Sequence, residues 1–187
     1  MKLYIAILFV CFIATSCTKS TSGTNPPVQD SMNYYTDFNV SINDGQTLYY
    51  SSKTDSMYTS VDSVKANDID ICIVKGKGKT TGLYFVSPDS LASLGFFPFV
   101  GAKHTLYKFS TTLDSNNFKN SDYTTWDIPD TAILYVIGTL GSTDYEIVFK
   151  NSNNKKGLIH ITTFHNWIGG SSPGSASYFT GELKVQK

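Results

Sequence analysis

The residues of this chain that could do chemistry are few, and none of them forms a recognisable catalytic set. A Gly-x-Ser-x-Gly pattern at residues 170–174 puts Ser172 in the position of a hydrolase nucleophile. A nucleophile elbow needs a strand before the serine, a helix after it and a histidine downstream. Here Pro173 and an expected strand follow, and all three histidines lie upstream. We therefore interpret the segment as a surface loop and predict that the protein is not an enzyme.

Three histidines and two tryptophans are the candidate ligand-binding residues: His104, His160, His165, Trp126 and Trp167. The histidine spacing is not that of a zinc site, which favours pairs at short set intervals. On a regular strand, His160 and His165 would point to opposite faces because their numbers differ by an odd count. Two histidines from different strands could still converge as axial haem ligands, so haem is the one cofactor left open. An exposed tryptophan could stack on a sugar or porphyrin, although a tryptophan more often packs the end of a sandwich.

The acidic residues indicate no metal site. Residues 114–117, with Asp122 beyond them, resemble the start of a calcium loop, but no glycine supplies the sharp turn and no glutamate closes the site. Asp68 and Asp70 are expected on one face of a strand, where they would meet solvent or lysines.

Short runs of β-branched and aromatic residues separated by turn clusters predict an all-β, β-dominated fold. The expected strands are residues 34–42, 47–50, 68–74, 82–86, 104–110, 131–137, 145–150, 158–164 and 178–185. Asp44-Gly45 predicts a hairpin between the first two strands, and residues 151–157 predict another before strand 158–164. Ser87, Pro88 and Gly95 have the types expected at the start and stop of a short helix. The prediction is an antiparallel β-sandwich with one or two short helical turns.

The N-terminus has the pattern of an export signal. Lys2 precedes an apolar run over residues 3–14, and Thr15-Ser16 precedes Cys17. The run is shorter than the roughly 20 residues that a bilayer-spanning helix needs. The segment ending at Cys17 resembles the lipobox of bacterial lipoproteins, which implies a signal peptide over 1–16 and acyl chains such as palmitate on Cys17. The alternative is an ordinary secretory signal followed by a coincidental cysteine.

The rest of the chain divides into a flexible tether and one domain. Residues 17–30 are rich in Ser, Thr, Asn and Pro, and residues 31–187 suit a single β-sandwich domain. All 15 cations are lysines against 15 acidic residues. Without arginine the chain lacks the planar fork that favours phosphate and guanine, so nucleic acid is not an expected partner. Cys11 leaves with the signal and Cys17 carries lipid, so Cys72 has no disulfide partner and is expected as a small buried hydrophobe.

An Asp-Ser or Asp-Thr pair followed by an apolar residue recurs in the chain. The pattern is similar to the O-glycosylation acceptor of exported Bacteroidetes proteins, but Asp-Ser is also favoured in turns and caps on its own account. The candidate acceptors are Ser31, Ser56, Ser63, Ser90 and Thr131.

Several segments together resemble exported lipoproteins of Bacteroidetes. They are the lipobox, the tether and residues 67–70, 86–89, 156–161 and 181–187. Some of those proteins are distantly similar to haem-capturing HmuY-like lipoproteins, which are also β-rich, but no haem-ligating pair carries over to positions in this chain. The resemblance implies an outer-membrane lipoprotein, facing the periplasm or the exterior, that is held to the membrane by its lipid. We expect it to bind a small molecule or glycan, with haem capture and a structural or adhesive role as the alternatives.

Overall fold

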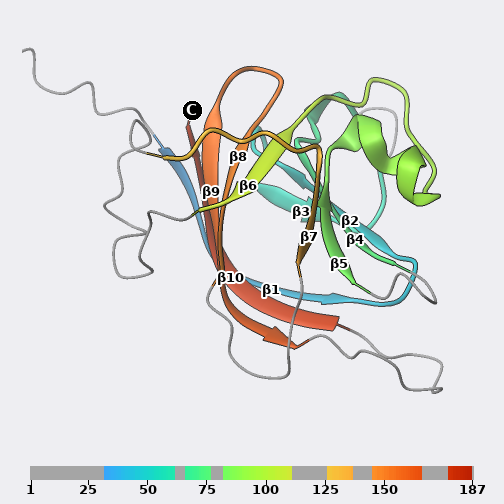
Figure 1. The fold of residues 1–187 in the computed structure, drawn as a ribbon, viewed down its shortest axis with the longest axis horizontal. Helices are drawn as coiled ribbons and strands as arrows, with labels where there is room; N and C mark the ends of the chain where they lie inside the picture. The colour runs from blue at the N-terminus through green and yellow to red at the C-terminus, as the bar shows by residue number, and fades with distance from the viewer. Residues whose placement is uncertain are drawn as a thin grey trace, which may run out of the picture.

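The computed structural model describes residues 32–61, 66–76, 82–110, 126–136, 145–165 and 177–186, which form two five-stranded sheets (Figure 1). Sheet A has the order β1 (Met32–Ile42), β10 (Ser177–Gln186), β9 (Lys156–His165), β8 (Tyr145–Lys150) and β6 (Leu106–Phe109). Sheet B has the order β3 (Ser56–Tyr58), β2 (Thr47–Ser51), β4 (Ile71–Lys75), β5 (Leu83–Val86) and β7 (Ile133–Val136). Two short 3-10 helices are η1 (Ala66–Asp68) and η3 (Pro88–Leu94). The predicted antiparallel β-sandwich with short helical turns is confirmed.

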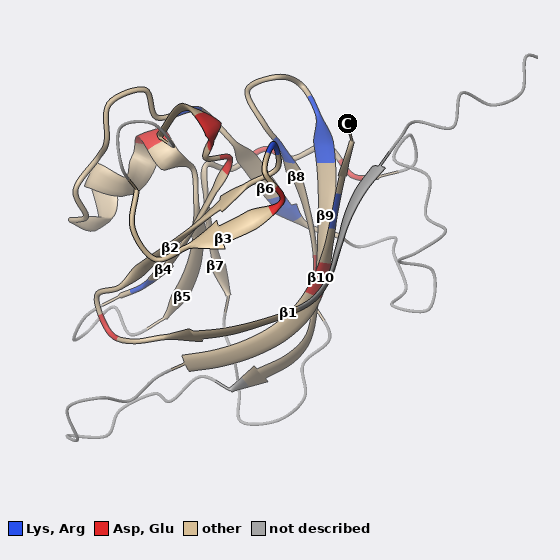
Figure 2. Ribbon diagram, turned by 180° about the vertical axis from the view of Figure 1, so that it is seen from behind, with Lys and Arg blue, Asp and Glu red and all other residues tan. Residues whose placement is uncertain are grey.

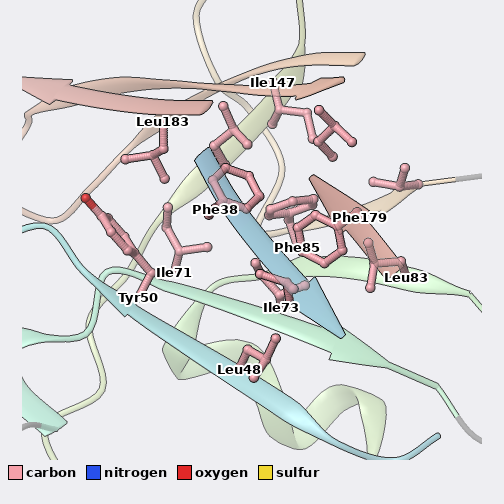
Figure 3. Close-up of a cluster of buried hydrophobic side chains, with 14 of the residues drawn as sticks. Phe38, Leu48, Tyr50, Ile71, Ile73, Leu83, Phe85, Ile147, Phe179 and Leu183 are labelled. Atoms are coloured by element: carbon pink, nitrogen blue, oxygen red, sulfur yellow. The ribbon is translucent and has the colours of Figure 1, made fainter. Parts of the chain in front are cut away.

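Alternating burial along the strands builds the core between the sheets. On β1, Phe38, Val40 and Ile42 are buried while Asn39 and Ser41 are exposed, as expected for a strand with one face in the core. Figure 3 shows side chains of both sheets meeting there. The core includes Phe38, Val40, Ile42, Leu48, Tyr50, Ile71, Ile73, Leu83, Phe85, Tyr107, Ile147, Phe149, Ile159, Ile161, Phe164, Phe179, Leu183 and Val185.

Strand β4 is buried on both faces because η3 covers the outer face of sheet B. Ile71 and Ile73 belong to the core between the sheets, whereas Cys72 and Val74 form a second cluster with Leu91 of η3. Burial raises the pKa of the Cys72 thiol. Cys72 is thus a free, buried cysteine, as predicted.

The predicted hairpin over residues 34–50 is wrong in its pairing, although its turn is present. Gln46 N–H donates to Asn43 O at 3.0 Å, and Gly45 has a φ of 76°. However, β1 pairs with β10 and β2 pairs with β3 and β4, so the turn carries the chain from one sheet to the other. The apolar residues of β1 and β2 meet across the core instead of side by side, and this burial decides which strands pair.

The second predicted hairpin is confirmed. Strands β8 and β9 pair from Tyr145↔Ile161 to Lys150↔Lys156, and residues 151–155 connect them. Asn151 Oδ1 accepts the backbone N–H groups of Asn153 at 3.0 Å and Lys155 at 3.1 Å, which holds the connection closed.

The predicted short helix is a 3-10 helix. Pro88 occupies the first turn and Gly95 ends the helix with a φ of 77°. Ser87 precedes it, but the Ser87 side chain does not cap the helix. The Ser87 hydroxyl instead donates to the Asp89 carboxylate and accepts the Thr105 backbone N–H at 2.8 Å.

Asp68 and Asp70 do not share a strand face, because β4 begins only at Ile71. Asp68 lies in η1 and pairs with Lys53 at 3.0 Å, as expected for an exposed acid. Asp70 is buried, so the expectation that it meets solvent or lysines is wrong.

Several sequence predictions concern residues outside the described ranges. These are the signal peptide, the tether, Cys17, Ser31, Ser63, residues 114–117, Asp122, Trp167, Ser172 and the side chain of His165. Among the described residues, no helix has the length and apolar character needed to cross a membrane.

Candidate functional site

His104 belongs to a small hydrogen-bonded group beside η3. Its Nδ1 lies 2.8 Å from Asp89 Oδ2, and the Ser87 and Ser90 hydroxyls donate to Asp89 Oδ1. Burial is the largest influence on the pKa of Asp89, and it raises that pKa because it disfavours the charged form. The hydrogen bonds from Ser87, His104 and Ser90, together with the charge of His104, outweigh it and lower the Asp89 pKa. In this group the Ser87 hydroxyl donates to the Asp89 carboxylate, and the His104 imidazole contacts the other oxygen of the same carboxylate.

The structure does not bring His104 and His160 together. His160 pairs with Glu146 near the start of β8, whereas β6 begins at Leu106, which pairs with Lys150 at the other end of β8. Four strand residues span about 13 Å, and His104 lies two residues before Leu106. These two histidines are therefore not placed as a pair of axial ligands.

His160 is the middle residue of a row of ionisable side chains on the outer face of sheet A. Glu146, His160 and Glu182 are cross-strand neighbours on β8, β9 and β10. Glu146 and His160 are buried, and the Glu182 side chain is 21% exposed. His160 Nδ1 lies 3.9 Å from Glu182 Oε2. Figure 2 shows acidic and basic stretches on these neighbouring strands.

Trp126 covers part of the same outer face. The Lys184 ammonium lies 5.3 Å from the centre of the Trp126 ring, a cation–π contact. Burial lowers the Lys184 pKa, and the Glu146 carboxylate partly opposes that shift. Trp126 is buried, which agrees with a packing role and not with an exposed stacking platform. His160 and Trp126 are thus the two candidate residues that the structure places around one cluster.

An open cavity of about 280 Å³ adjoins this row, and we call it the outer-face cavity; Phe38 and Gly181 form the apolar part of its lining. Its polar lining consists of Asn39, Thr162, Thr180 and Glu182. The Thr162 hydroxyl lies 3.0 Å from the Thr180 hydroxyl. Its volume is just below the roughly 300–1,000 Å³ usual for ligand pockets. A carboxylate, an amide and two hydroxyls around one cavity can hydrogen-bond a ligand that carries several polar groups.

A β-bulge shapes the outer-face cavity. Thr180 pairs with Thr163 but Gly181 pairs with Ile161, so Thr162 is an additional residue in β9. Bulges re-aim side chains relative to a regular strand. The prediction that His160 and His165 point to opposite faces assumed a regular strand. The bulge at Thr162 lies between them, so the assumption does not hold for β9.

Sequence reasoning missed all four polar residues of the outer-face cavity. One available signal was Gly181, since a glycine inside a strand often marks a bulge or a close backbone approach. A Cβ at Gly181 would lie 2.1 Å from the His160 carbonyl oxygen, so the two backbones approach more closely than any side chain would allow.

A second cavity of about 280 Å³ lies beside sheet B and was also missed. It is lined by Ser41, Gly45, Gln46, Thr47, Leu48, Tyr49, Thr59, Phe96 and Phe97. The sequence signal was the run Gly95-Phe96-Phe97-Pro98-Phe99-Val100-Gly101, which has no polar side chain.

The candidate glycosylation sites within the described ranges make local hydrogen bonds. The Ser56 hydroxyl donates to Thr54 O at 3.0 Å, the Ser90 hydroxyl to Asp89, and the Thr131 hydroxyl to Ile133 O at 2.9 Å. These contacts agree with the turn and cap interpretation. Glycosylation stays a prediction.

Comparison with known proteins gave no match: no protein-family model, no curated protein and no solved structure matches the chain. The resemblance to Bacteroidetes lipoproteins therefore stays a prediction.

Proposed function

We propose that this protein is a lipid-anchored cell-envelope protein that binds a hydroxyl-rich small molecule, such as a saccharide, in the outer-face cavity. The observation that carries the proposal is the polar lining of that cavity by Asn39, Thr162, Thr180 and Glu182. The pattern of residues 1–17 supports the lipid anchor and a location in the outer membrane.

The lining matches the hydrogen-bonding needs of neighbouring hydroxyl groups. The Glu182 carboxylate accepts hydrogen bonds, whereas Thr162, Thr180 and Asn39 can both donate and accept. His160 is buried beside Glu182 and restricts where that side chain can move. A polar group held in place before binding loses less entropy on binding, which favours affinity.

The test is to screen the full chain, reconstituted in nanodiscs, against a glycan array and to measure hits by calorimetry. Glu182→Gln should weaken binding about 10-fold to 100-fold, because a hydrogen bond to a charged group contributes about 1.5–3 kcal/mol. Asn39→Ala should also weaken it. Ser152→Ala is the control, because Ser152 is exposed in the β8–β9 connection and lies outside both the outer-face cavity and the cavity beside sheet B.

Two results would contradict the proposal. One is a glycan that binds the chain equally well with Glu182→Gln and with Ser152→Ala. The other is the absence of glycan binding together with a haemin Soret shift that disappears when His104, His160 and His165 are all replaced by alanine, which would support haem capture instead.

A further inference from the structure

The segment between η3 and β6 exposes large apolar side chains, and we call residues 95–102 the aromatic loop. Phe97 and Val100 are each 94% exposed, more than any other large hydrophobic side chain in the part of the chain that the structure describes. No residue of the loop carries a polar side chain, and Figure 2 shows no charge on the segment directly after η3. Exposed apolar patches of this kind mark contacts with proteins or membranes.

The loop is held in a fixed shape with Phe97 and Val100 at its tip. Phe96 N–H donates to Leu91 O at 3.2 Å, and Ala102 N–H donates to Phe99 O at 3.3 Å. The Phe99 ring meets Tyr49 of β2 edge-on at 5.9 Å. Phe96 and Phe99 therefore pack on the outer face of sheet B, and the exposure of Phe97 and Val100 follows from the local geometry.

Two glycines make this geometry accessible. Gly95 and Gly101 bound the apolar run with φ values of 77° and 82°, a region that other residues rarely adopt. The chain thus turns at both ends of the run and presents its middle outward.

We propose that the aromatic loop inserts Phe97 and Val100 into the interface of a phospholipid bilayer. A lipid is the occupant favoured by the loop's composition, because hydrocarbon accepts apolar side chains without hydrogen bonds. A glycan would find no polar side chain over residues 95–102 with which to pair. Lys103 follows the loop directly, and a cation beside an apolar tip suits anionic headgroups.

The second cavity provides room for a headgroup next to the tip. Phe96 and Phe97 line one part of it, and Gln46, Thr47 and Thr59 supply amide and hydroxyl groups. In a membrane interface the acyl chains lie below the polar headgroups. The apolar loop tip would contact the acyl chains, and the hydrogen-bonding groups of the cavity beside it would contact the headgroups.

The chain before β1 is long enough for this contact. If Cys17 carries lipid, the 14 residues from Thr18 to Ser31 separate the anchor from the first strand. They reach at most about 50 Å when extended. The sandwich would then remain close to the bilayer, which raises the effective concentration of lipid at the loop. The inference uses the proposed anchor only for this proximity and does not involve the outer-face cavity.

The test measures the depth of the loop tip in the membrane. Full chain carrying Phe97→Trp is reconstituted in phosphatidylethanolamine and phosphatidylglycerol vesicles whose acyl chains are brominated. Quenching of the added tryptophan is taken as the difference from the unsubstituted chain, which contains Trp126 and Trp167. Ile128→Trp is the matched control, because Ile128 is 75% exposed but lies outside the aromatic loop. Interfacial side chains sit about 5–10 Å deep, so we expect bromine near the headgroup end to quench Phe97→Trp several-fold more than Ile128→Trp. Adding Val100→Ser should weaken that quenching.

Repeating the measurement with Cys17→Ala separates the loop from the anchor. If Phe97→Trp is quenched more than Ile128→Trp only when Cys17 is present, the loop inserts but needs the lipid anchor to hold it near the bilayer. Selective quenching in both forms supports insertion by the loop itself. Equal quenching of the two tryptophan variants, or none, overturns the inference, and glycan binding measured in parallel shows whether the proposed function stands without it.

Discussion

Removal of the Asp70 carboxylate should destabilise the sandwich strongly, whereas removal of Asp68 two residues earlier should not. Asp70 Oδ2 accepts the Ser52 backbone N–H at 2.8 Å and the Ser52 hydroxyl at 2.6 Å, and Asp70 Oδ1 accepts the Asn151 amide at 3.0 Å. Ser52 follows β2 of sheet B, and Asn151 lies in the β8–β9 connection of sheet A. The buried carboxylate therefore joins the two sheets at one end, while Asp68 pairs with Lys53, whose side chain is largely exposed.

The expected magnitudes follow from burial. Each hydrogen bond to a charged acceptor contributes about 1.5–3 kcal/mol, and a buried donor left unpaired costs about 1–3 kcal/mol. The Asn151 amide is buried, whereas the half-buried Ser52 groups can recruit water. Asp70→Ala should therefore cost about 3–5 kcal/mol. Asp68→Ala breaks an exposed ion pair and should cost less than about 1 kcal/mol.

Asp70→Asn distinguishes loss of hydrogen bonds from loss of volume. One end of its side chain would be an NH₂ group, which would face either the NH₂ of Asn151 or the backbone N–H of Ser52. Asn151 cannot flip to offer oxygen, because Asn151 Oδ1 already accepts the backbone N–H groups of Asn153 and Lys155. We expect a cost of about 1–3 kcal/mol, between the other two variants. Urea unfolding monitored by fluorescence gives all three values on the same chain. The reasoning is refuted if Asp70→Ala and Asp68→Ala shift the midpoint equally at unchanged m.

Three further predictions concern single sites. Gly181→Ala should cost about 3 kcal/mol in urea unfolding, because its Cβ overlaps the His160 carbonyl; a stable variant would contradict the bulge geometry. The pKa of Asp89 in the folded chain lies below the ordinary value of 3.8. The ionised Asp89 carboxylate therefore stabilises the folded chain fully above pH 3.8, and this stabilisation is lost as the pH falls through the lower pKa of the folded chain. His104→Ala should raise that pKa in a carbon NMR titration, and an unchanged pKa would disprove the contact. Cys72 should react with thiol reagents only as fast as the chain unfolds, since it is buried; rapid labelling of Cys72 itself in the native chain, identified by peptide mapping, would contradict this.

The sequence predicted those parts of the fold that depend on neighbouring residues. The β8–β9 hairpin and the 3-10 helix after Ser87 follow from strand runs and turn residues that lie next to one another in the chain. The Asn43–Gln46 turn also formed, yet the strands on either side entered different sheets. A turn fixes a reversal of the chain, but the partner of a strand depends on which distant strand covers its apolar face, and no local pattern encodes that choice.

The candidate sites were harder to predict for a related reason. The outer-face cavity depends on the register between β9 and β10, a relation between segments about 20 residues apart. Asn39, Thr162, Thr180 and Glu182 are ordinary polar residues in the sequence and gain significance only from that register. The aromatic loop was in principle accessible, because its run without polar side chains is visible in the sequence, but only the structure shows that two of its apolar residues point outward.

The two proposed surfaces lie on opposite layers of the sandwich, which makes them compatible. The aromatic loop packs on the outer face of sheet B through Phe96 and Phe99, whereas the outer-face cavity opens on the outer face of sheet A. A molecule resting on the bilayer through Phe97 and Val100 would therefore turn sheet A away from the lipid. Glu182 and its neighbours would then face the solvent from which a hydroxyl-rich ligand arrives. The same orientation predicts that vesicle binding leaves glycan affinity unchanged, since a membrane covering the cavity would have to compete with the ligand.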